Sequence, residues 1–468
     1  MGKTINSNNT SEIQIATLNT RSLRTSEKLI ELEIALEEIK WDILGLSELR
    51  RFGDGIVDCG KYILHYKGET PGLYGVGFMI KKKYAKNIVE IKGVSERIAL
   101  LNIKLPLNKG KDETWSIIQA YSPTESDKKE DIAKIENFYK DLQTTIDSCY
   151  KNIIVMGDFN GQIGECQTGE NYTIGKFGFG SRSNNGSRLI SFALENKLSI
   201  LNSFYNKKKA KKWTWMSPNG LYKNEIDFIL SNKRNVFKDV TTLNNFNFNT
   251  DHKMVRGTLT ANYRKSRKFQ NKYIPVANAS NNDMLLNNIT SALKNIDKVS
   301  NSVQEKYNYL LKALTTETKR TNLETKRSIS CEAKKLLEER KILLSKEKDK
   351  ETRKKISELS KKINEQIRKD RKTKRTRNLQ KHIEKTGGIK KAIKELDAQK
   401  EWMPSAKSKE GKYCTGRSEI IKIATDYYKN LYKCQHNTLE PTNNILLEEN
   451  EIIPKILKEE THRWALTR

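Results

Sequence analysis

Two polar side chains follow an apolar stretch near the middle of the chain. Residues 151–164 read KNIIVMGDFNGQIG, and the run IIVM has the composition of a buried strand. Asp158 and Asn160 come next, with Phe159 between them. Alternate residues of an extended chain share a face, so both polar groups would point one way and Phe159 the other. A simple turn fits this stretch equally well, because Gly, Asp and Asn favour turns.

Other strand-like runs also end in polar residues. In chain order these residues are Asn19, Glu48, Tyr121, Asp227, Asp251 and His252. Each alone has an ordinary explanation, such as a solvated carboxylate, a turn aromatic or a surface hydrogen bond. Together they offer what metal-assisted attack on a phosphodiester needs. Carboxylates suit Mg²⁺, Asn and Tyr can hydrogen-bond phosphate oxygens, and a carboxylate-held His can bind phosphate or move a proton.

The charge of the chain is unevenly distributed. The 468 residues carry a net charge of +30, which favours a polyanionic partner, nucleic acid before membrane. Residues 261–468 hold 49 of the 87 Lys and Arg residues and 27 of the 57 Asp and Glu residues, so most of the excess lies there. We find no apolar run of membrane-spanning length and no signal peptide, and we expect no membrane partner. The six cysteines form no C-x-x-C pair, which favours free thiols in a reducing compartment.

Short strands and a few helices dominate the first part of the chain. The predicted strands are 13–19, 42–48, 74–80, 97–105, 115–121, 198–204, 224–230 and 252–259. Apolar residues at helical spacing predict two amphipathic helices, one marked by Leu29, Leu32, Leu36 and Ile39, and one by Ile132, Ile135, Phe138, Leu142 and Ile146. This pattern predicts an α+β fold in which two sheets pack face to face with helices outside.

The second part has the texture of long helix. Residues 302–384 contain no Pro or Gly and are rich in Lys, Glu and Arg, with a short apolar stripe that weakly favours a coiled coil. We therefore divide the chain into a disordered N-terminus (1–12), a strand-rich domain expected to fold alone (13–260), a linker (261–301), a basic helical region (302–400) and a final helical segment (401–468).

Six motifs resemble, in the right order, those of the endonuclease/exonuclease/phosphatase superfamily. They are LNTRS (18–22), LSELR (46–50), AYSP (120–123), GDFNGQIG (157–164), EIDFIL (225–230) and TDH (250–252). The stretches GSRLISFALENKLSILNSFYN and KWTWMSPNGLYKNEIDFIL look like the endonuclease domain of non-LTR retrotransposons and of host proteins of the craniofacial development protein 2-like type. The segment 416–433 is similar to the one that joins endonuclease to reverse transcriptase. No Asp-Asp dipeptide occurs, so the polymerase centre is absent, and we interpret the chain as a truncated or degenerate element product.

The resemblance implies a four-layer sandwich of two mixed sheets flanked by helices, with the active centre at the strand ends. Asp158 would orient or deprotonate water, Asn160 would hold the phosphate, and Tyr121 would contact it. His252, paired with Asp227, would stabilise the developing charge. Glu48 would bind Mg²⁺, or Mn²⁺ as a substitute, aided by Asp251 and Asn19. Thr250 replaces the usual Ser and Leu49 replaces a common Thr.

A basic and aromatic stretch precedes a predicted β-hairpin. Lysines 207–209, 211 and 212 precede two tryptophans, and Ser217-Pro218-Asn219-Gly220 is a strong turn signal. A solvated hairpin flank explains the lysines about as well. In the retrotransposon enzymes this hairpin resembles the element that probes a DNA groove. The residues expected to contact nucleic acid are Arg50, Lys211, Lys212, Trp215, Asn219, Tyr222 and Lys223.

The sequence predicts a Mg²⁺-dependent endonuclease that nicks one DNA strand and leaves a 3′-hydroxyl. Two alternatives stay open: the same fold acting on RNA or inositol phosphates, and a non-catalytic nucleic-acid-binding remnant. The run KDRKTKRTR (369–377) fits a nuclear localisation signal, a contact with the element's RNA, or an exposed helix face. We expect the nucleus, with the cytoplasm as an alternative.

Overall fold

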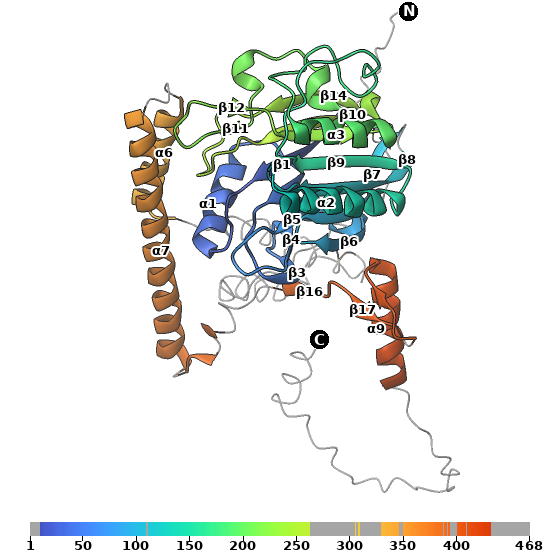
Figure 1. Ribbon diagram of the computed structural model, residues 1–468. Helices are drawn as coiled ribbons and strands as arrows, with labels where there is room; N and C mark the ends of the chain where they lie inside the picture. The colour runs from blue at the N-terminus through green and yellow to red at the C-terminus, as the bar shows by residue number, and fades with distance from the viewer. Residues whose placement is uncertain are drawn as a thin grey trace, which may run out of the picture. The chain divides into compact units, whose positions relative to one another are not determined.

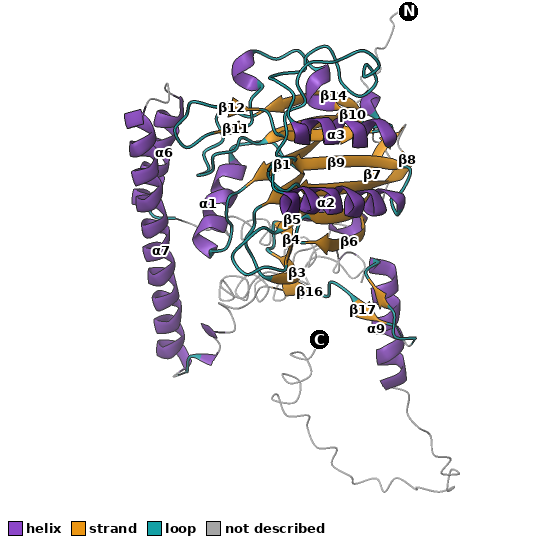
Figure 2. Cartoon of the chain, in the orientation of Figure 1, coloured by secondary structure: helices purple, strands orange, loops and turns teal. Residues whose placement is uncertain are grey.

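The structure, a computed structural model, describes residues 10–108, 111–262, 305, 308, 329–345, 350–386, 388–390, 392–393, 400–408 and 410–431. The strand-rich part is a sandwich of two mixed sheets (Figures 1 and 2). The first sheet has the order β14 (Phe237–Thr242), β15 (Val255–Asn262), β1 (Thr10–Asn19), β2 (Ile43–Ser47), β5 (Val76–Lys81), β4 (Tyr62–Gly68), β3 (Gly53–Asp58) and β16 (Lys400–Trp402). The second has the order β10 (Ser199–Ile200), β13 (Asp227–Ser231), β9 (Asn152–Asp158), β8 (Lys111–Tyr121), β7 (Ile98–Asn108) and β6 (Ile88–Ser95).

Helices cover both outer faces of the sandwich. Helix α1 (Ser26–Glu37) packs its leucines on the outer face of the first sheet, whereas α2 (Lys129–Asp147) and α3 (Asn184–Glu195) cover the second. The core between the sheets is mainly apolar, with Ile15 and Phe78 on one side and Ile117 on the other. A buried amide, Gln119 of β8, donates to the Ser47 hydroxyl of β2 at 2.8 Å. These layers confirm the predicted four-layer α+β sandwich.

Some predicted elements differ from the observed ones. The predicted strand 198–204 is only β10, which a 3-10 helix, Leu201–Phe204, follows. The run 224–230 is interrupted, because Asn224 ends β12 (Lys223–Asn224) and β13 begins only at Asp227. Helix α3 was not predicted. Strand β1 begins at Thr10, earlier than the expected boundary, and the proposed linker 261–301 lies, beyond Asn262, outside the described residues.

The basic region forms a helix pair. Helix α6 (Cys331–Ser345) packs against α7 (Lys350–Thr386), and α7 also contacts α1. The apolar stripe of α7 is thus used within the chain: Ile363 and Ile367 form a cluster with Leu337 of α6. This intramolecular packing takes the place of the coiled-coil partner that the sequence weakly favoured.

The last described segment begins as strand rather than helix. Strand β16 pairs with β3 at the edge of the first sheet, and a small ribbon follows, β17 (Ala406–Lys407) with β18 (Tyr413–Cys414). Helix α9 (Arg417–Leu431) follows, and the chain divides after Ile420 into two compact units. No helix among the described residues combines the length and apolar composition needed to cross a membrane.

Candidate active site

Strand register brings the predicted site residues to one edge of the sandwich. Strand β8 runs parallel to β9 with Tyr121 opposite Asp158, and β13 runs antiparallel to β9 with Asp227 opposite the same Asp158. In the other sheet, β1 and β2 run parallel and end together at Asn19 and Ser47, immediately before Glu48. Carboxyl ends of parallel strands meet at one edge. Residues from six motifs therefore converge although they are up to 233 positions apart, from Asn19 to His252.

The backbone is strained where it delivers these side chains. Glu48 has φ 50° and Asn160 has φ 46°, a left-handed conformation that costs a non-glycine residue about 1–3 kcal/mol. Asn tolerates it better than most residues, but Glu does not. At Gly157 a Cβ would lie 1.9 Å from the Ala120 carbonyl oxygen, so only glycine allows β9 to approach β8 directly before Asp158. Such strain persists only where surrounding packing holds it, and it is typical of functional sites.

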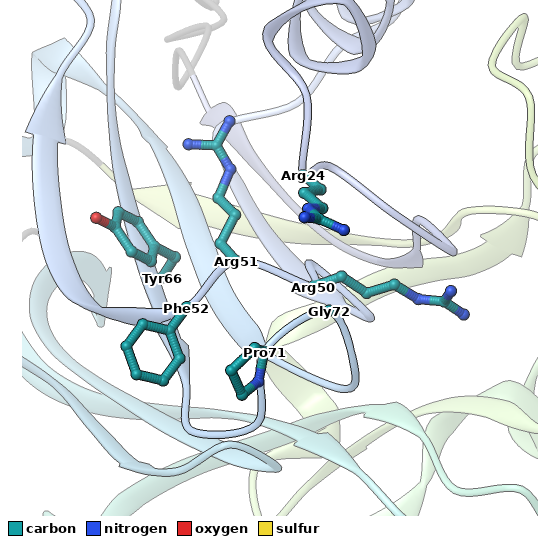
Figure 3. Close-up of a pocket in the computed structure, with 7 residues that line it drawn as sticks. All are labelled: Arg24, Arg50, Arg51, Phe52, Tyr66, Pro71 and Gly72. Atoms are coloured by element: carbon teal, nitrogen blue, oxygen red, sulfur yellow. The ribbon is translucent and has the colours of Figure 1, made fainter.

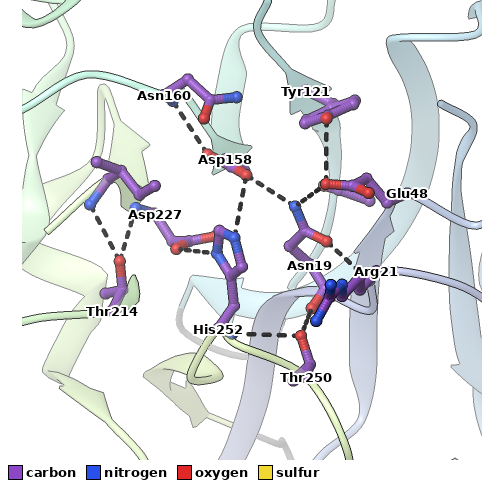
Figure 4. Close-up of polar contacts among 12 residues, drawn as sticks. Asn19, Arg21, Glu48, Tyr121, Asp158, Asn160, Thr214, Asp227, Thr250 and His252 are labelled. Carbon is purple, nitrogen blue, oxygen red and sulfur yellow. Dashed lines mark hydrogen bonds and ion pairs between the residues drawn. The ribbon is translucent and has the colours of Figure 1, made fainter. Parts of the chain in front are cut away.

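A continuous hydrogen-bond network joins the two sheets at this edge (Figure 4). The Asn19 amide donates to Glu48 Oε1 at 2.9 Å and to Asp158 Oδ2 at 2.8 Å. The Tyr121 hydroxyl also donates to Glu48 Oε1, at 3.1 Å. Asn19 thus bridges two carboxylates that come from different sheets, which fixes their spacing.

An imidazole lies between two buried carboxylates. His252 Nδ1 is 2.9 Å from Asp227 Oδ2, and His252 Nε2 is 3.8 Å from Asp158 Oδ2. Burial opposes protonation, but Asp227 and Asp158 outweigh it and raise the pKa of His252 to about 10. The ring is therefore an imidazolium at neutral pH. Burial and the charge of Asp227 raise the pKa of Asp158 to about 7, so this carboxyl can accept a proton near neutrality.

Glu48 has a different electrostatic setting. Burial opposes its ionisation, but hydrogen bonds from Asn19 and Arg50 lower the pKa of Glu48 below its usual value. The Arg50 guanidinium donates to Glu48 Oε2 at 2.7 Å. Burial and the adjacent Glu48 carboxylate raise the pKa of the Tyr121 phenol, which remains a proton donor. The site thus combines one firmly ionised carboxylate with one that titrates near neutrality, the separation typical of acid–base sites.

Two asparagines present groups other than those expected. The Asn19 oxygen accepts from Arg21 N at 2.9 Å, so Asn19 offers N–H groups to the site. The structure therefore favours a positioning donor over the expected metal ligand. Asn160 lies beside Asp158, whose Oδ1 accepts its backbone N–H at 3.0 Å, while its side-chain amide donates to the Ser122 carbonyl at 2.8 Å. That side chain is held at the rim of the site.

The donor set fits a hard divalent cation. Asp158, Asp227 and His252 place ligand-type atoms within 4.8 Å of one another, and buried Asp227 Oδ1 has no hydrogen-bond partner among the described residues. A protonated His252 has no free lone pair, so we do not assign this group of three as a complete metal site. The ionised Glu48 carboxylate offers the oxygen donors that Mg²⁺ prefers. The Thr250 hydroxyl donates to the Asn19 carbonyl at 2.8 Å, which holds the 250–252 loop at the end of β1.

The predicted hairpin is present. Strands β11 (Trp215–Met216) and β12 pair antiparallel, and the backbone of Trp215 forms a bridge to His252. Tyr222 is 64% exposed, and the turn is fixed because the Asn219 side-chain oxygen accepts from Leu221 N at 3.1 Å. The hairpin thus projects beside the candidate site, as expected.

The lysines before the hairpin differ from one another. Lys211 and Lys223 are exposed and available to a phosphate. Lys212 is buried, and its ammonium group donates to the Phe177 and Asn202 carbonyls at 2.6 and 3.0 Å. This internal role excludes the expected contact between Lys212 and nucleic acid in the folded chain. The sequence, with five lysines in six residues, does not indicate which of them is buried.

Three further residues support the site without having been predicted. The Thr214 hydroxyl accepts the backbone N–H groups of Ile226 and Asp227 at 3.0 and 3.1 Å, at the point where β13 begins. The Asn202 amide donates to the Asp227 carbonyl at 3.0 Å. Arg97 donates to the Tyr121 carbonyl at 3.2 Å, and its guanidinium lies over the Tyr121 ring. Asn202 and Thr214 lie in stretches whose resemblance is noted above, but the supporting role of all three residues depends on contacts with distant residues, so only the tertiary structure reveals it.

A basic cavity adjoins Glu48 (Figure 3). It has a volume of about 280 Å³ and is lined by Arg24, Arg50, Arg51, Phe52, Tyr66, Pro71 and Gly72. Arg51 supports its wall, since Nε donates to the Leu23 carbonyl at 2.8 Å. Phe52 is 66% exposed. Guanidinium groups beside an exposed aromatic ring suit a phosphate next to an unstacked base.

Comparisons with known proteins show what part of the chain is similar to. Residues 115–256 match the family model described as Endonuclease-reverse transcriptase. Craniofacial development protein 2 of Bos taurus is 29% identical over 226 residues, which is 48% of this chain and 36% of that protein. The Tragulus javanicus protein is 28% identical, over 48% of this chain and 38% of its own length. The aligned part is thus little more than a third of either relative.

Two solved structures are similar in outline. The endonuclease domain of TRAS1, a telomere-specific non-LTR retrotransposon, matches with a TM-score of 0.38 and 13% identity, covering 54% of this chain and all of that one (100%). The Xenopus laevis APE2 catalytic domain matches with a TM-score of 0.39 and 16% identity, covering 54% and 94%.

The two packed sheets carry a cluster of polar and charged side chains at one edge. The family match falls within the part of the chain from β1 to β15, and this match and the curated relatives show what the chain is similar to. The chain resembles craniofacial development protein 2.

Proposed function

We propose that this protein is a Mg²⁺-dependent DNA endonuclease of retrotransposon origin that nicks one strand. The observation that carries the proposal is the continuous network from Tyr121 through Glu48, Asn19 and Asp158 to His252, built across both sheets. A phosphodiester hydrolase needs a proton acceptor for water, charge that stabilises the phosphate, and oxygen ligands for a cation. This network supplies all three.

In the proposed reaction, water attacks the phosphorus and the P–O3′ bond breaks. Asp158, whose pKa is raised to about 7, accepts the proton from water. The imidazolium of His252, held by Asp227, stabilises the negative charge that grows on the phosphate oxygens, and Tyr121 and Asn160 lie at the rim to orient it. The leaving oxygen takes a proton from solvent, which yields a 3′-hydroxyl and a 5′-phosphate.

A divalent cation would supply further charge stabilisation when bound. Glu48 would hold it, with Asp251 from the adjoining loop. Arg50 now neutralises Glu48, so a cation binding there competes with this guanidinium. An Arg50 side chain displaced from Glu48 by the cation could then contact the substrate backbone.

The substrate backbone would run from the cavity at Arg24 and Phe52, past Glu48, to the hairpin beside His252. Exposed basic residues of α7, such as Lys369 and Arg375, would add general affinity for DNA or for the element's RNA. The basic run in α7 also supports our proposal of a nuclear protein.

The test is a substrate panel on the full chain. Supercoiled plasmid, single-stranded DNA, RNA and an inositol phosphate are each incubated with Mg²⁺, with Mn²⁺ and with EDTA. We expect nicked plasmid with a primer-competent 3′ end, in the metal-containing reactions alone. If only RNA or the inositol phosphate is hydrolysed, the substrate is not DNA and the proposal is wrong in its substrate class. Binding of nucleic acid without hydrolysis would indicate a non-catalytic remnant.

A further inference from the structure

The helix pair α6–α7 is built into the nuclease domain. Figure 1 shows it alongside α1, and the contact is apolar at its centre: Leu337 and Ile363 pack with Ile30 and Ile34 of α1. This packing joins residues more than 300 positions apart in the sequence. A helix pair that served only as a spacer would not need such a contact.

A buried arginine lies at this contact. Arg340 of α6 is 1% exposed, and burial of a guanidinium is costly unless it is fully paired. Its Nη1 donates to Glu31 Oε1 at 2.7 Å and to Ser360 Oγ at 3.2 Å. Its Nε donates to Asn247 Oδ1 at 2.8 Å and its Nη2 to the Asn247 carbonyl at 3.0 Å. Each nitrogen of the guanidinium therefore has a partner.

One of these partners, Asn247, belongs to the segment that carries the candidate catalytic histidine. The stretch Phe246–His252 reads FNFNTDH; Phe246 and Phe248 are buried against α1, while Asn247 turns to the helix pair. The Asn247 amide returns a bond to the Leu337 carbonyl at 2.9 Å. Side chain and backbone of Asn247 are thus both fixed by α6.

The contacts continue to the active site. Glu31 Oε1, which Arg340 holds, also accepts from Asn249 N at 3.1 Å. The Thr250 hydroxyl donates to the Asn19 carbonyl and accepts from His252 N at 3.2 Å. These polar contacts, together with the peptide bond between Asn249 and Thr250, therefore connect α6 to the backbone of His252.

We propose that Arg340 is a positioning residue: through Glu31 and Asn247 it fixes the 246–252 segment, so that the α6–α7 pair is a working part of the nuclease. The proposal rests on the proposed function for its kinetic readout, but its structural readout does not. Displacement of a catalytic group by about 1 Å can lower turnover by about a hundredfold.

The test compares four variants of the full chain. Arg340→Met removes the charge and the donors, and Arg340→Lys keeps the charge without the planar fork. Glu31→Gln/Arg340→Met also removes the charge of the buried carboxylate, which Arg340→Met leaves paired with Lys28 alone. Lys341→Met is the matched control, since Lys341 is the next residue of α6 and pairs at the surface with Glu38. The readouts are hydrogen exchange of the 246–252 amides, melting temperature, and kcat and KM for plasmid nicking.

We expect Arg340→Met to speed exchange in 246–252 while β9 stays protected, and to lower kcat about a hundredfold with KM within about threefold. Arg340→Lys should recover part of both, and Lys341→Met should match the wild type. In the double variant the melting temperature should return toward the wild-type value. Hydrogen exchange in 246–252 should stay fast and kcat should stay low, because Asn247 still lacks the Arg340 donors.

Two results would overturn the proposal: unchanged exchange in 246–252 for Arg340→Met, or full recovery of kcat in the double variant, which would show a role in stability alone. If Arg340→Met does not fold, Arg340→Lys and the double variant give the same decision. Should the wild type cleave no nucleic acid, the proposed function fails, and the exchange comparison still decides the role of Arg340.

Discussion

At the scale of single residues, the site depends on carboxylates that differ in their surroundings. Asp158 and Asp227 lie on either side of a charged imidazole, whereas Glu48 is paired with a guanidinium. Burial next to Asp227 raises the pKa of Asp158, and hydrogen bonds lower that of Glu48. One group is thereby prepared to take a proton and the other to hold a cation.

His252 should remain protonated well above neutral pH in the metal-free protein. Its pKa is raised from 6.5 to about 10, so its stabilising effect is fully present below 6.5 and is lost as pH rises through about 10. Asp227→Asn removes the nearer carboxylate and should lower this pKa, shifting the loss of stability to lower pH. An NMR titration of the imidazole and melting curves at several pH values measure both effects. An unchanged titration in Asp227→Asn would contradict the assigned pairing.

Glu48 should govern the response to metal. Glu48→Gln keeps the shape but removes the charge, and we expect the half-saturating Mg²⁺ concentration for nicking to rise at least about tenfold. Glu37→Gln is the control, since Glu37 is an exposed residue paired with Lys61. If both variants titrate like the wild type, the cation lies elsewhere.

At the scale of elements, the strand ends were predictable and their pairing was not. Asn19, Glu48, Tyr121 and Asp158 could be found because each ends an apolar run, a local pattern. Their register depends on contacts between distant strands, which no local pattern encodes. The hairpin was predictable from its Pro-Asn-Gly turn, since turn chemistry is also local.

The elements that failed did so for physical reasons. The segment 201–204 reads LNSF, and its two central polar residues are buried. It forms a 3-10 helix in which the Asn202 side-chain oxygen accepts from Ile229 N of β13 at 3.1 Å. The α6–α7 pair has a charged surface with a short apolar stripe. This pattern predicted helix, but it did not indicate that the pair packs against α1. The buried role of Arg340 could not be predicted, because Arg340 is one basic residue among many in that region.

The 216–223 hairpin should choose where DNA is cut. Replacing its loop by a two-residue Asn-Gly turn should redistribute nick positions on a plasmid while turnover stays within about tenfold, because the chemistry lies in other residues. A second variant, Leu221→Ala/Tyr222→Ala, keeps the turn and separates its shape from its two exposed side chains. If both variants nick the plasmid at the same positions as the wild type, the hairpin has no role in target choice.

At the scale of the whole molecule, the tail adds both charge and structure to the sandwich. Residues 1–262 keep both sheets except the edge strand β16, so we still expect this part to fold. In that shorter chain Glu31 would be exposed to water. Removal of its partner Arg340 should therefore destabilise the fold less than Arg340→Met does in the full chain. The basic residues of α7 would be gone.

The full chain should therefore bind duplex DNA more tightly and with a steeper salt dependence than residues 1–262. Each phosphate contact adds about 0.9 to the slope of log affinity against log salt concentration. Fluorescence anisotropy over a range of salt concentrations measures both slopes. Equal slopes would mean that the tail makes no contact with DNA.

The central claim is that the cluster at the joint edge of the two sheets cleaves phosphodiesters, and Asp158→Asn tests it most directly. The substitution keeps the shape and removes the proton acceptor. We expect plasmid nicking at saturating Mg²⁺ to fall about a thousandfold. The melting temperature should stay equal or rise, because a buried carboxylate beside Asp227 is removed. Nicking by Asp158→Asn at the wild-type rate, with the same sensitivity to EDTA, would contradict the account.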